Sequence, residues 1–280
     1  MRPVTFPIFV LALFTACRDS TGTGNQTQPV AHIRIINSLY QGTPAASATP
    51  VAIDYLIDAS TASPGVANLG GNAIGGGAAS NDYQDVTVGV HSFMARIAGK
   101  STTTDSLYTT TTSLPWVPRQ YLTANAFYTI VVSGVIPATG AIPNNNVPFT
   151  ALVDDPFPPV KVNGAYQARF RVINAAPYAA ASGNGTTLNV FITPGPTPPA
   201  PLNTFSALTT ASYRNASGYL NIDAGTYVLT IAVGSAIIVS QSTITFAPGE
   251  VRTFIIQSNG PAPAPGVANH KLTSIVDQTY

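Results

Sequence analysis

The sequence predicts an all-β protein made of two tandem antiparallel β-sandwich domains. Residues that favour helices are scarce, because the 280 residues include one glutamate, three lysines and two methionines but 12 tyrosines and 12 phenylalanines. Runs of four to eight β-branched, aromatic or other apolar residues are bounded by Gly, Pro, Asn or Ser, which is typical of strands. These runs occur twice in the same order, which predicts two domains.

Residues 1–16 have the layout of a signal peptide. Arg2 gives a positive start, and the apolar stretch 4–14 is too short to span a bilayer as a helix. Two small residues then precede Cys17, although Phe14 stands where Leu, Val or Ile is usual. The layout resembles that of bacterial lipoproteins, in which such a cysteine is acylated and becomes the N-terminus. We therefore expect lipidation at Cys17, with an ordinary secretory signal and an incidental cysteine as the alternative.

Residues 17–29 are mostly small and polar, without hydrophobic periodicity, and predict a flexible tether. A lipid anchor would make the membrane a partner and place the protein in the cell envelope, exposed to the periplasm or the cell surface. Cys17 is the only cysteine, so no intramolecular disulfide can form. The formal net charge of +1 provides no basic footprint, and we expect no nucleic-acid partner.

Five sequence blocks are repeated. The pairs are AHIRIIN (31–37) with ARFRVIN (168–174), IDYLID (53–58) with LNVFIT (188–193), YQDVTVGVHSF (83–93) with YLNIDAGTYVL (219–229), LTANAFYTIVV (122–132) with FAPGEVRTFII (246–256), and ALVDD (151–155) with SIVDQ (274–278). The spacing falls from 135–137 in the first three pairs to 123–124 in the last two, which places an insertion around residues 101–119. The repeat predicts domains over residues 30–158 and 165–280, joined by a short proline-stiffened linker.

Alternation within the blocks predicts which face of each strand is apolar. In the first block Ile33 and Ile35 share one face, and Arg34 lies on the other, as does Arg171 in the second copy. Gly89 and Gly225 predict hairpin turns at matching positions.

Three further runs, 226–233, 236–246 and 250–257, predict a meander with turns at Gly234–Ser235 and Pro248–Gly249. About seven short antiparallel strands per copy favour a two-sheet sandwich, with a small barrel as the alternative.

The second copy resembles the bacterial family called domain of unknown function 4397. The resemblance rests on ARFRVINAAP, LNVFI, SGYLNIDAGTYVLTI and ITFAPGEVRTFII. The first copy carries IDYLID, but Ser38-Leu39-Tyr40 and Val90-His91 depart from the family's pattern. The resemblance implies Ig-like β-sandwich modules, often in tandem, on exported or surface-attached proteins, and it implies no catalytic residues.

Motifs that resemble cofactor or metal sites are incomplete. The segment Ala98–Ser101 lacks the earlier glycine of a phosphate-binding loop and predicts a hairpin turn. The glycine-rich stretch 70–77 predicts a flexible loop, with a ligand lid as the alternative. His32, His91 and His270 are too scattered for a zinc site, with His91 expected to pack or to be half exposed. We expect no cofactor and no metal.

Carboxylates and one tryptophan remain as candidates. Asp54 and Asp58 share the face of one strand, and a solvated face is favoured over a calcium site because carboxylates prefer water. Trp116, between Pro115 and Pro118 in the predicted insertion, is either a ligand contact or a plug at the end of the sandwich.

These observations predict a non-catalytic lipoprotein of the cell envelope, with a structural, adhesive or ligand-binding role. Its partner would be a surface glycan or protein that the sequence does not identify. The alternative is a carbohydrate-active or other hydrolytic module that uses loops of the first domain.

Overall fold

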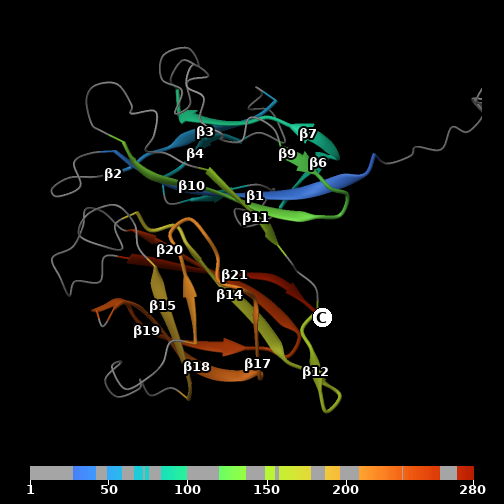
Figure 1. The fold of residues 1–280 in the computed structure, drawn as a ribbon, viewed down its shortest axis with the longest axis vertical. Coiled ribbons are helices and arrows are strands. Elements are labelled where there is room, and N and C mark those ends of the chain that lie inside the picture. The colour runs from blue at the N-terminus through green and yellow to red at the C-terminus, as the bar shows by residue number, and fades with distance from the viewer. Residues whose placement is uncertain are drawn as a thin grey trace, which may run out of the picture.

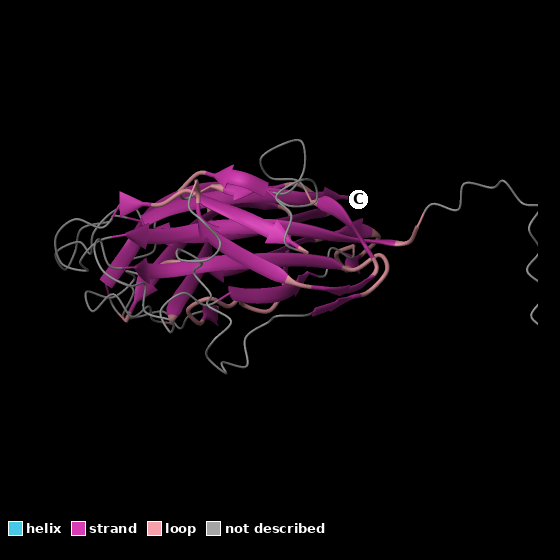
Figure 2. Ribbon diagram, turned by 90° about the horizontal axis from the view of Figure 1, so that it is seen from above, coloured by secondary structure: helices cyan, strands magenta, loops and turns pink. Residues whose placement is uncertain are grey.

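The structure is a computed structural model. It describes residues 28–41, 49–58, 66–71, 73–75, 83–99, 120–136, 149–154, 158–177, 187–195, 208–234, 236–258 and 270–280. Within these ranges all regular structure is β-strand, and no helix occurs (Figure 2). No helix long and apolar enough to cross a bilayer is therefore found in the described part of the chain. The predicted all-β fold is confirmed.

The N-terminal half, residues 28–154, stacks two layers of strands. One layer contains β11 (Phe149–Asp154), β10 (Phe127–Ile136), β1 (Val30–Gln41) and β2 (Thr49–Pro50) in that order, with β5 (Ile74–Gly75) and β6 (Gln84–Thr87) also paired to β1. The other strands are β4 (Val66–Leu69), β3 (Ile53–Ile57) and β8 (Phe93–Ile97), which form one sheet, and the pair β7 (Gly89–His91) and β9 (Gln120–Leu122). Ile33 and Ile35 face the core between the layers, as their alternation predicts.

The C-terminal half, residues 158–280, contains two four-stranded sheets. The first contains β17 (Leu220–Ile222), β14 (Ala168–Asn174), β20 (Glu250–Ser258) and β21 (His270–Thr279), and the second contains β16 (Thr209–Ala211), β15 (Leu188–Pro194), β18 (Gly225–Val233) and β19 (Ala236–Phe246). Their shared core includes Phe170, Phe246 and Phe254, whose ring centroids lie 5.6–6.1 Å apart.

The connection between the halves contains a hairpin. Strands β12 (Lys161–Val162) and β13 (Ala165–Tyr166) pair across Asn163 and Gly164, whose φ angles are 52° and 84°. A two-residue hairpin turn with positive φ at both positions favours Asn-Gly, so this signal was present in the sequence. The predicted proline-containing linker thus also contains a short hairpin.

The sequence repeat is also a repeat of strand pairing. β1 pairs in parallel with β10, with Arg34 opposite Thr129. β14 pairs in parallel with β20, with Arg171 opposite Thr253. These parallel pairs differ from the expected antiparallel order because the chain crosses to the other layer before it returns, and only such a crossover connects parallel strands.

The predicted meander is correct for two strands and wrong for the third. β18 and β19 form the expected hairpin, but β20 belongs to the other sheet. The turn at Pro248–Gly249 therefore carries the chain between sheets. Gly249 has φ +78° there, and a Cβ on it would lie 2.4 Å from the carbonyl oxygen of Tyr280.

Gly89 and Gly225 also lie where the chain changes sheets, which corrects the hairpin turns predicted for them. β6 pairs with β1 whereas β7 pairs with β9, and β17 pairs with β14 whereas β18 pairs with β15 and β19. Both glycines have positive φ, 143° and 156°, which side chains disfavour.

The two halves pack through their matching sheets, with β1, β10 and β11 facing β14, β20 and β21 (Figure 1). A third apolar cluster draws on both halves and contains Ile36, Ile74, Val131, Leu152, Ile173, Ala175, Ile255 and Ile275. The central facing strands β1, β10, β14 and β20 are thus buried on both sides, once in the core of their own half and once against the other half.

Candidate functional site: the buried charged cluster between the halves

Two residues selected from the sequence lie outside the described residues. These are Cys17, the predicted lipidation site, and Trp116, the predicted ligand contact. The predicted insertion, residues 101–119, also lies outside them. All three stay predictions.

The glycine-rich stretch is described at Gly70, Gly71 and Gly75. Gly75 belongs to β5 and pairs with Ile35 of β1, so this part is a strand and the expectation of a flexible loop is wrong there. A Cβ on Gly71 would lie 2.4 Å from Pro50, which shows how closely the backbones approach. The glycines therefore allow packing.

The two strand carboxylates do not share a solvated face. Asp54 is buried at 6% exposure and forms an ion pair with Arg96 at 2.9 Å. Asp58 lies just beyond β3, at φ 52°, and accepts hydrogen bonds from the Ser92 backbone N–H and from Ser92 Oγ. The prediction fails because Asp54 meets Arg96 on the neighbouring strand β8, and because the strand ends before Asp58.

His91 is buried. It was expected either to pack inside the protein or to be half exposed, and the first expectation is the correct one. Its Nδ1 lies 2.7 Å from Asp58 Oδ2 and its Nε2 lies 2.7 Å from the carbonyl oxygen of Thr87. Ser92 Oγ contacts Asp58 and not His91, so these three residues lack the serine–histidine contact of a catalytic triad. Among the described residues, no three His, Cys, Asp or Glu side chains gather into a possible metal site.

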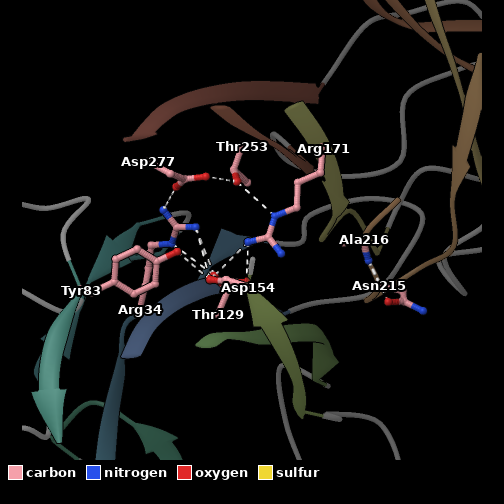
Figure 3. Close-up of polar contacts among 9 residues, drawn as sticks. All are labelled: Arg34, Tyr83, Thr129, Asp154, Arg171, Asn215, Ala216, Thr253 and Asp277. Carbon is pink, nitrogen blue, oxygen red and sulfur yellow. Dashed lines mark hydrogen bonds and ion pairs between the residues drawn. The ribbon is translucent and has the colours of Figure 1, made fainter. Parts of the chain in front are cut away.

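The main polar feature of the structure is a buried charged cluster between the halves. We call it the interface cluster, and its members are Arg34, Tyr83, Thr129, Asp154, Arg171, Tyr219, Thr253 and Asp277 (Figure 3 shows all but Tyr219). The two arginines are 0% and 1% exposed. Two arginines and two aspartates make the cluster formally neutral.

Two ion pairs in the interface cluster cross from one half to the other, whereas Arg34 Nη2 and Asp154 Oδ2, 3.8 Å apart, form a pair within the N-terminal half. Arg34 Nη1 of β1 donates to Asp277 Oδ1 of β21 at 2.7 Å. Arg171 Nη2 of β14 lies 2.5 Å from Asp154 Oδ1 of β11. Removing one member of such a pair would leave a buried charge without its partner, which costs several kcal/mol.

The N-terminal half holds Asp154 from its own side as well. Tyr83 and Thr129 donate their hydroxyl protons to Asp154 Oδ2 at 2.6 and 2.5 Å. Arg34 Nε and Nη2 donate to Thr129 Oγ1 at 3.3 and 3.2 Å, and its guanidinium lies 4.5 Å from the centre of the Tyr83 ring.

The C-terminal half holds Asp277 in a related way. Thr253 Oγ1 donates to Asp277 Oδ2 at 2.5 Å, and Arg171 Nε donates to Thr253 Oγ1 at 3.1 Å. The Arg171 guanidinium lies 4.8 Å from the centre of the Tyr219 ring. The Tyr219 hydroxyl is buried and has no hydrogen-bond partner among the described residues.

Burial and charge shift the pKa values of the cluster. Burial alone would lower the pKa of Arg34, but Tyr83 and the carboxylates of Asp277 and Asp154 outweigh it and raise the pKa. Burial, and then the charge of Asp154, raise the pKa of Tyr83. Burial raises the pKa of Tyr219 to about 12. These groups therefore keep one protonation state at neutral pH, which suits structural contacts better than proton transfer.

Two polar contacts extend the interface beyond the charged cluster. Ser133 Oγ donates to the carbonyl oxygen of Ala175, and it also lies 3.0 Å from the hydroxyl oxygen of Tyr213. Gln257 Nε2 donates to the carbonyl oxygen of Asn37 at 3.0 Å. Each half thus sends a side chain from its parallel-paired strand, β10 or β20, to the backbone of the other half.

Sequence reasoning missed this interface, although two signals were present. The aligned blocks ALVDD and SIVDQ place Asp154 and Asp277 at the same position of the repeat. Apolar runs such as Ile35–Ile36 and Ile130–Val132 lack strict alternation, which is typical of strands buried on both faces.

Comparisons with known proteins give no family. No family model matches the chain, and no curated protein matches it. Among solved structures, it is similar to the Bacillus anthracis TIE protein, with TM-score 0.20 and 9% identity, covering 82% of this chain and 34% of that one. A leucine-rich repeat protein from Bacteroides thetaiotaomicron has TM-score 0.17 and 9% identity, with 85% and 26% covered. A candidate cell adhesion protein from Bacteroides eggerthii has TM-score 0.17 and 12% identity, with 90% and 96% covered. The chain spans about a third or less of the first two.

Proposed function

We propose that this chain is a non-catalytic lipoprotein of the cell envelope, in which two β-sandwich modules form one rigid block on an N-terminal tether. The block would serve as a structural, adhesive or ligand-binding element facing the periplasm or the cell surface. The signal-like residues 1–16, the polar segment 17–29 and the resemblance to domain of unknown function 4397 support this proposal.

The observation that carries the proposal is how the carboxylates are used. Each of the seven acidic side chains that the structure describes contacts another protein group: Asp54, Asp58, Asp85, Asp154, Asp223, Glu250 and Asp277. Acid–base catalysis needs a carboxylate or histidine that can reach a substrate and exchange a proton with it. Here Asp54, Asp154 and Asp277 join strands or halves to each other, and Glu250 binds Arg252 of its own strand.

A rigid block fits a structural or adhesive role because the two halves cannot turn against each other without separating buried charges. The interface cluster lies beside eight apolar residues shared by both halves. Turning one half would expose these residues and leave Arg171 and Asp277 without their charged partners. Any ligand held by one half would then keep a fixed position relative to the other half.

Membrane attachment is tested by changing Cys17 to Ala in the full chain, with Ser20→Ala as the matched control. We expect the wild type and the control to pellet with membranes and to take up labelled fatty acid. The Cys17→Ala variant should be exported without label and recovered in the soluble fraction. Unchanged membrane partition of Cys17→Ala would refute acylation at this residue.

The ligand-binding part of the proposal is tested with glycan and peptide arrays, using the fragment of residues 28–280. Trp116→Ala should weaken any detected binding by at least about tenfold, as expected for an aromatic hot spot. Leu208→Ala is the matched control, because Leu208 is 50% exposed on the other half. Turnover of an arrayed glycan would instead support the hydrolytic alternative.

A further inference from the structure

The two ion pairs across the interface are counterparts of each other, with the halves exchanged. The repeat aligns Arg34 with Arg171 at a spacing of 137, and Asp154 with Asp277 at a spacing of 123. Arg34 of the N-terminal half binds Asp277 of the C-terminal half, and Arg171 of the C-terminal half binds Asp154 of the N-terminal half. The same arginine–aspartate contact is therefore made twice, in opposite directions.

The polar contacts at the edge of the interface correspond approximately, because their donors match and their acceptors are neighbours in the repeat. Ser133 and Gln257 occupy one repeat position, at a spacing of 124, and each donates to a backbone carbonyl of the other half. The acceptors belong to Ala175, just after β14, and to Asn37, within β1, and they lie one position apart in the repeat. The apolar members correspond too, since Ile36 aligns with Ile173.

Such reciprocity defines an interface of two-fold type. In a symmetric dimer the same patch serves both partners, so that residue i contacts residue j and residue j contacts residue i. A patch of this type must carry both the donor and the acceptor of every pair. The face of the C-terminal half does so, because Arg171, Thr253 and Asp277 project from its adjacent strands β14, β20 and β21.

We propose that this face is self-complementary, so that the C-terminal half, residues 158–280, binds a second copy of itself as a symmetric dimer. In that dimer Arg171 of each copy pairs with Asp277 of the other, and Gln257 donates to the backbone carbonyl of Asn174. The N-terminal half occupies the same face in the full chain, where its covalent attachment gives it a high effective concentration.

The C-terminal half meets the structural conditions for folding alone. None of its strands pairs with a strand of the N-terminal half in the described part of the chain. Its own aromatic and aliphatic core is drawn entirely from residues 168–272. A domain of this length can bury a sufficient core without help from a partner.

The first experiment measures the mass of the fragment 158–280 by light scattering, with its fold checked by far-UV circular dichroism. We expect a folded dimer at about 100 μM, within the range of weak to moderate protein association. Arg171→Asp should weaken the dimer by at least about 100-fold, because it places carboxylates opposite each other. A folded wild-type fragment that stays monomeric would overturn the proposal.

Charge exchange gives the matched control. Adding Asp277→Arg to Arg171→Asp should restore the dimer of the fragment, because the introduced arginine of one copy then faces the introduced aspartate of the other. In the full chain the same second change should fail to rescue Arg171→Asp, because Asp154 is the partner there and the arginine introduced at position 277 would face Arg34. Rescue in the full chain by Asp277→Arg, or no rescue in the fragment, would contradict the assigned pairing.

If the fragment does not fold, a designed chain with two C-terminal halves tests the proposal instead. In this chain a second copy of residues 168–277 replaces the N-terminal half, joined through the natural residues 155–167. A self-complementary face predicts that the duplicated chain folds and unfolds in one cooperative transition. Failure of both the fragment and the duplicated chain to fold would overturn the proposal.

Discussion

The two halves share their interface residues but differ in how each half supports its own aspartate. Asp154 accepts hydrogen bonds from Tyr83 and Thr129 of its own half and binds Arg171 of the other. Asp277 is held by Thr253 of its own half and by Arg34 of the other. The comparison shows that repeated residues set which groups pair, whereas local differences set how strongly each aspartate is held.

The halves also differ on the layer away from the interface. β18 runs unbroken for nine residues, whereas the matching stretch of the N-terminal half is divided into β7 and β8 on either side of Ser92. Asp58 lies at this break, where it accepts hydrogen bonds from Ser92 and His91 and leaves the β conformation at φ 52°. Its counterpart, Thr193, continues strand β15.

The largest expected effect tests the two aspartates against each other. Asp154→Asn should lower the free energy of unfolding by about 3–5 kcal/mol, because it leaves Arg171 buried without a charged partner. Asp277→Asn should cost less, because Asp277 has one supporting hydroxyl and Asp154 has two. Urea denaturation measures both, with the exposed Asp223→Asn as control, expected within about 0.5 kcal/mol of wild type. A larger cost for Asp277→Asn would reverse the comparison.

The two matching tyrosines, Tyr83 and Tyr219, should also differ in how much their hydroxyl groups stabilise the fold. The larger effect is again expected in the N-terminal half. Tyr83→Phe removes a hydrogen bond to a buried carboxylate and should cost about 1–3 kcal/mol. Tyr219→Phe removes a buried hydroxyl that lacks a partner among the described residues, so it should be close to neutral or slightly stabilising. Thermal and urea unfolding at pH 7 measure both variants. Equal costs would show that the Tyr219 hydroxyl is bonded in solution.

The contribution of Tyr219 to stability should also depend on pH in the alkaline range. Burial raises the pKa of Tyr219 from 10.0 to about 12, so its proton is released earlier from the unfolded chain than from the folded one. The stability linked to this proton is complete below pH 10 and is lost as the pH rises toward 12. Urea unfolding at pH 9 to 12 should therefore show a smaller loss for Tyr219→Phe than for wild type. Parallel curves would refute the shift.

The smallest effect concerns Asp58. Burial raises the pKa of its carboxyl, but hydrogen bonds from the Ser92 backbone and from His91 outweigh this and lower it. The linked stability is present above the ordinary aspartate pKa and is lost as the pH falls through the lower, folded value. Asp58→Asn, which tolerates the positive φ, should be less stable than wild type at neutral pH, and the difference should shrink in acid. A constant difference in melting temperature across this range would contradict the assignment.

The sequence predicted the fold through features that repeat locally. Alternation placed Ile33 in the core and Arg34 on the opposite face, and the five paired blocks matched strands that pair in the same way. The sequence could not predict what covers the opposite face. Arg34, Thr129 and Asp154 have the character of a solvated surface, and only the partner sheet, more than a hundred residues away in the sequence, makes that surface an interior.

The sequence also could not predict which sheet each strand joins. The runs that became β18, β19 and β20 were correctly bounded, but a turn such as Pro248–Gly249 fits both a hairpin and a crossing between sheets. The choice depends on which edge is free to pair, and β14 offers a long buried partner for β20. Pairing over such a distance leaves no local signal.

The reciprocal pairing across the interface is tested most directly by double-mutant cycles in the full chain. One cycle combines Arg171→Met with Asp154→Asn, and the other combines Arg171→Met with Asp277→Asn, each followed by urea unfolding. We predict a coupling energy of at least about 2 kcal/mol for the pair between halves and a clearly smaller one for the pair within the C-terminal half. Equal couplings, or a larger coupling between Arg171 and Asp277, would contradict the account.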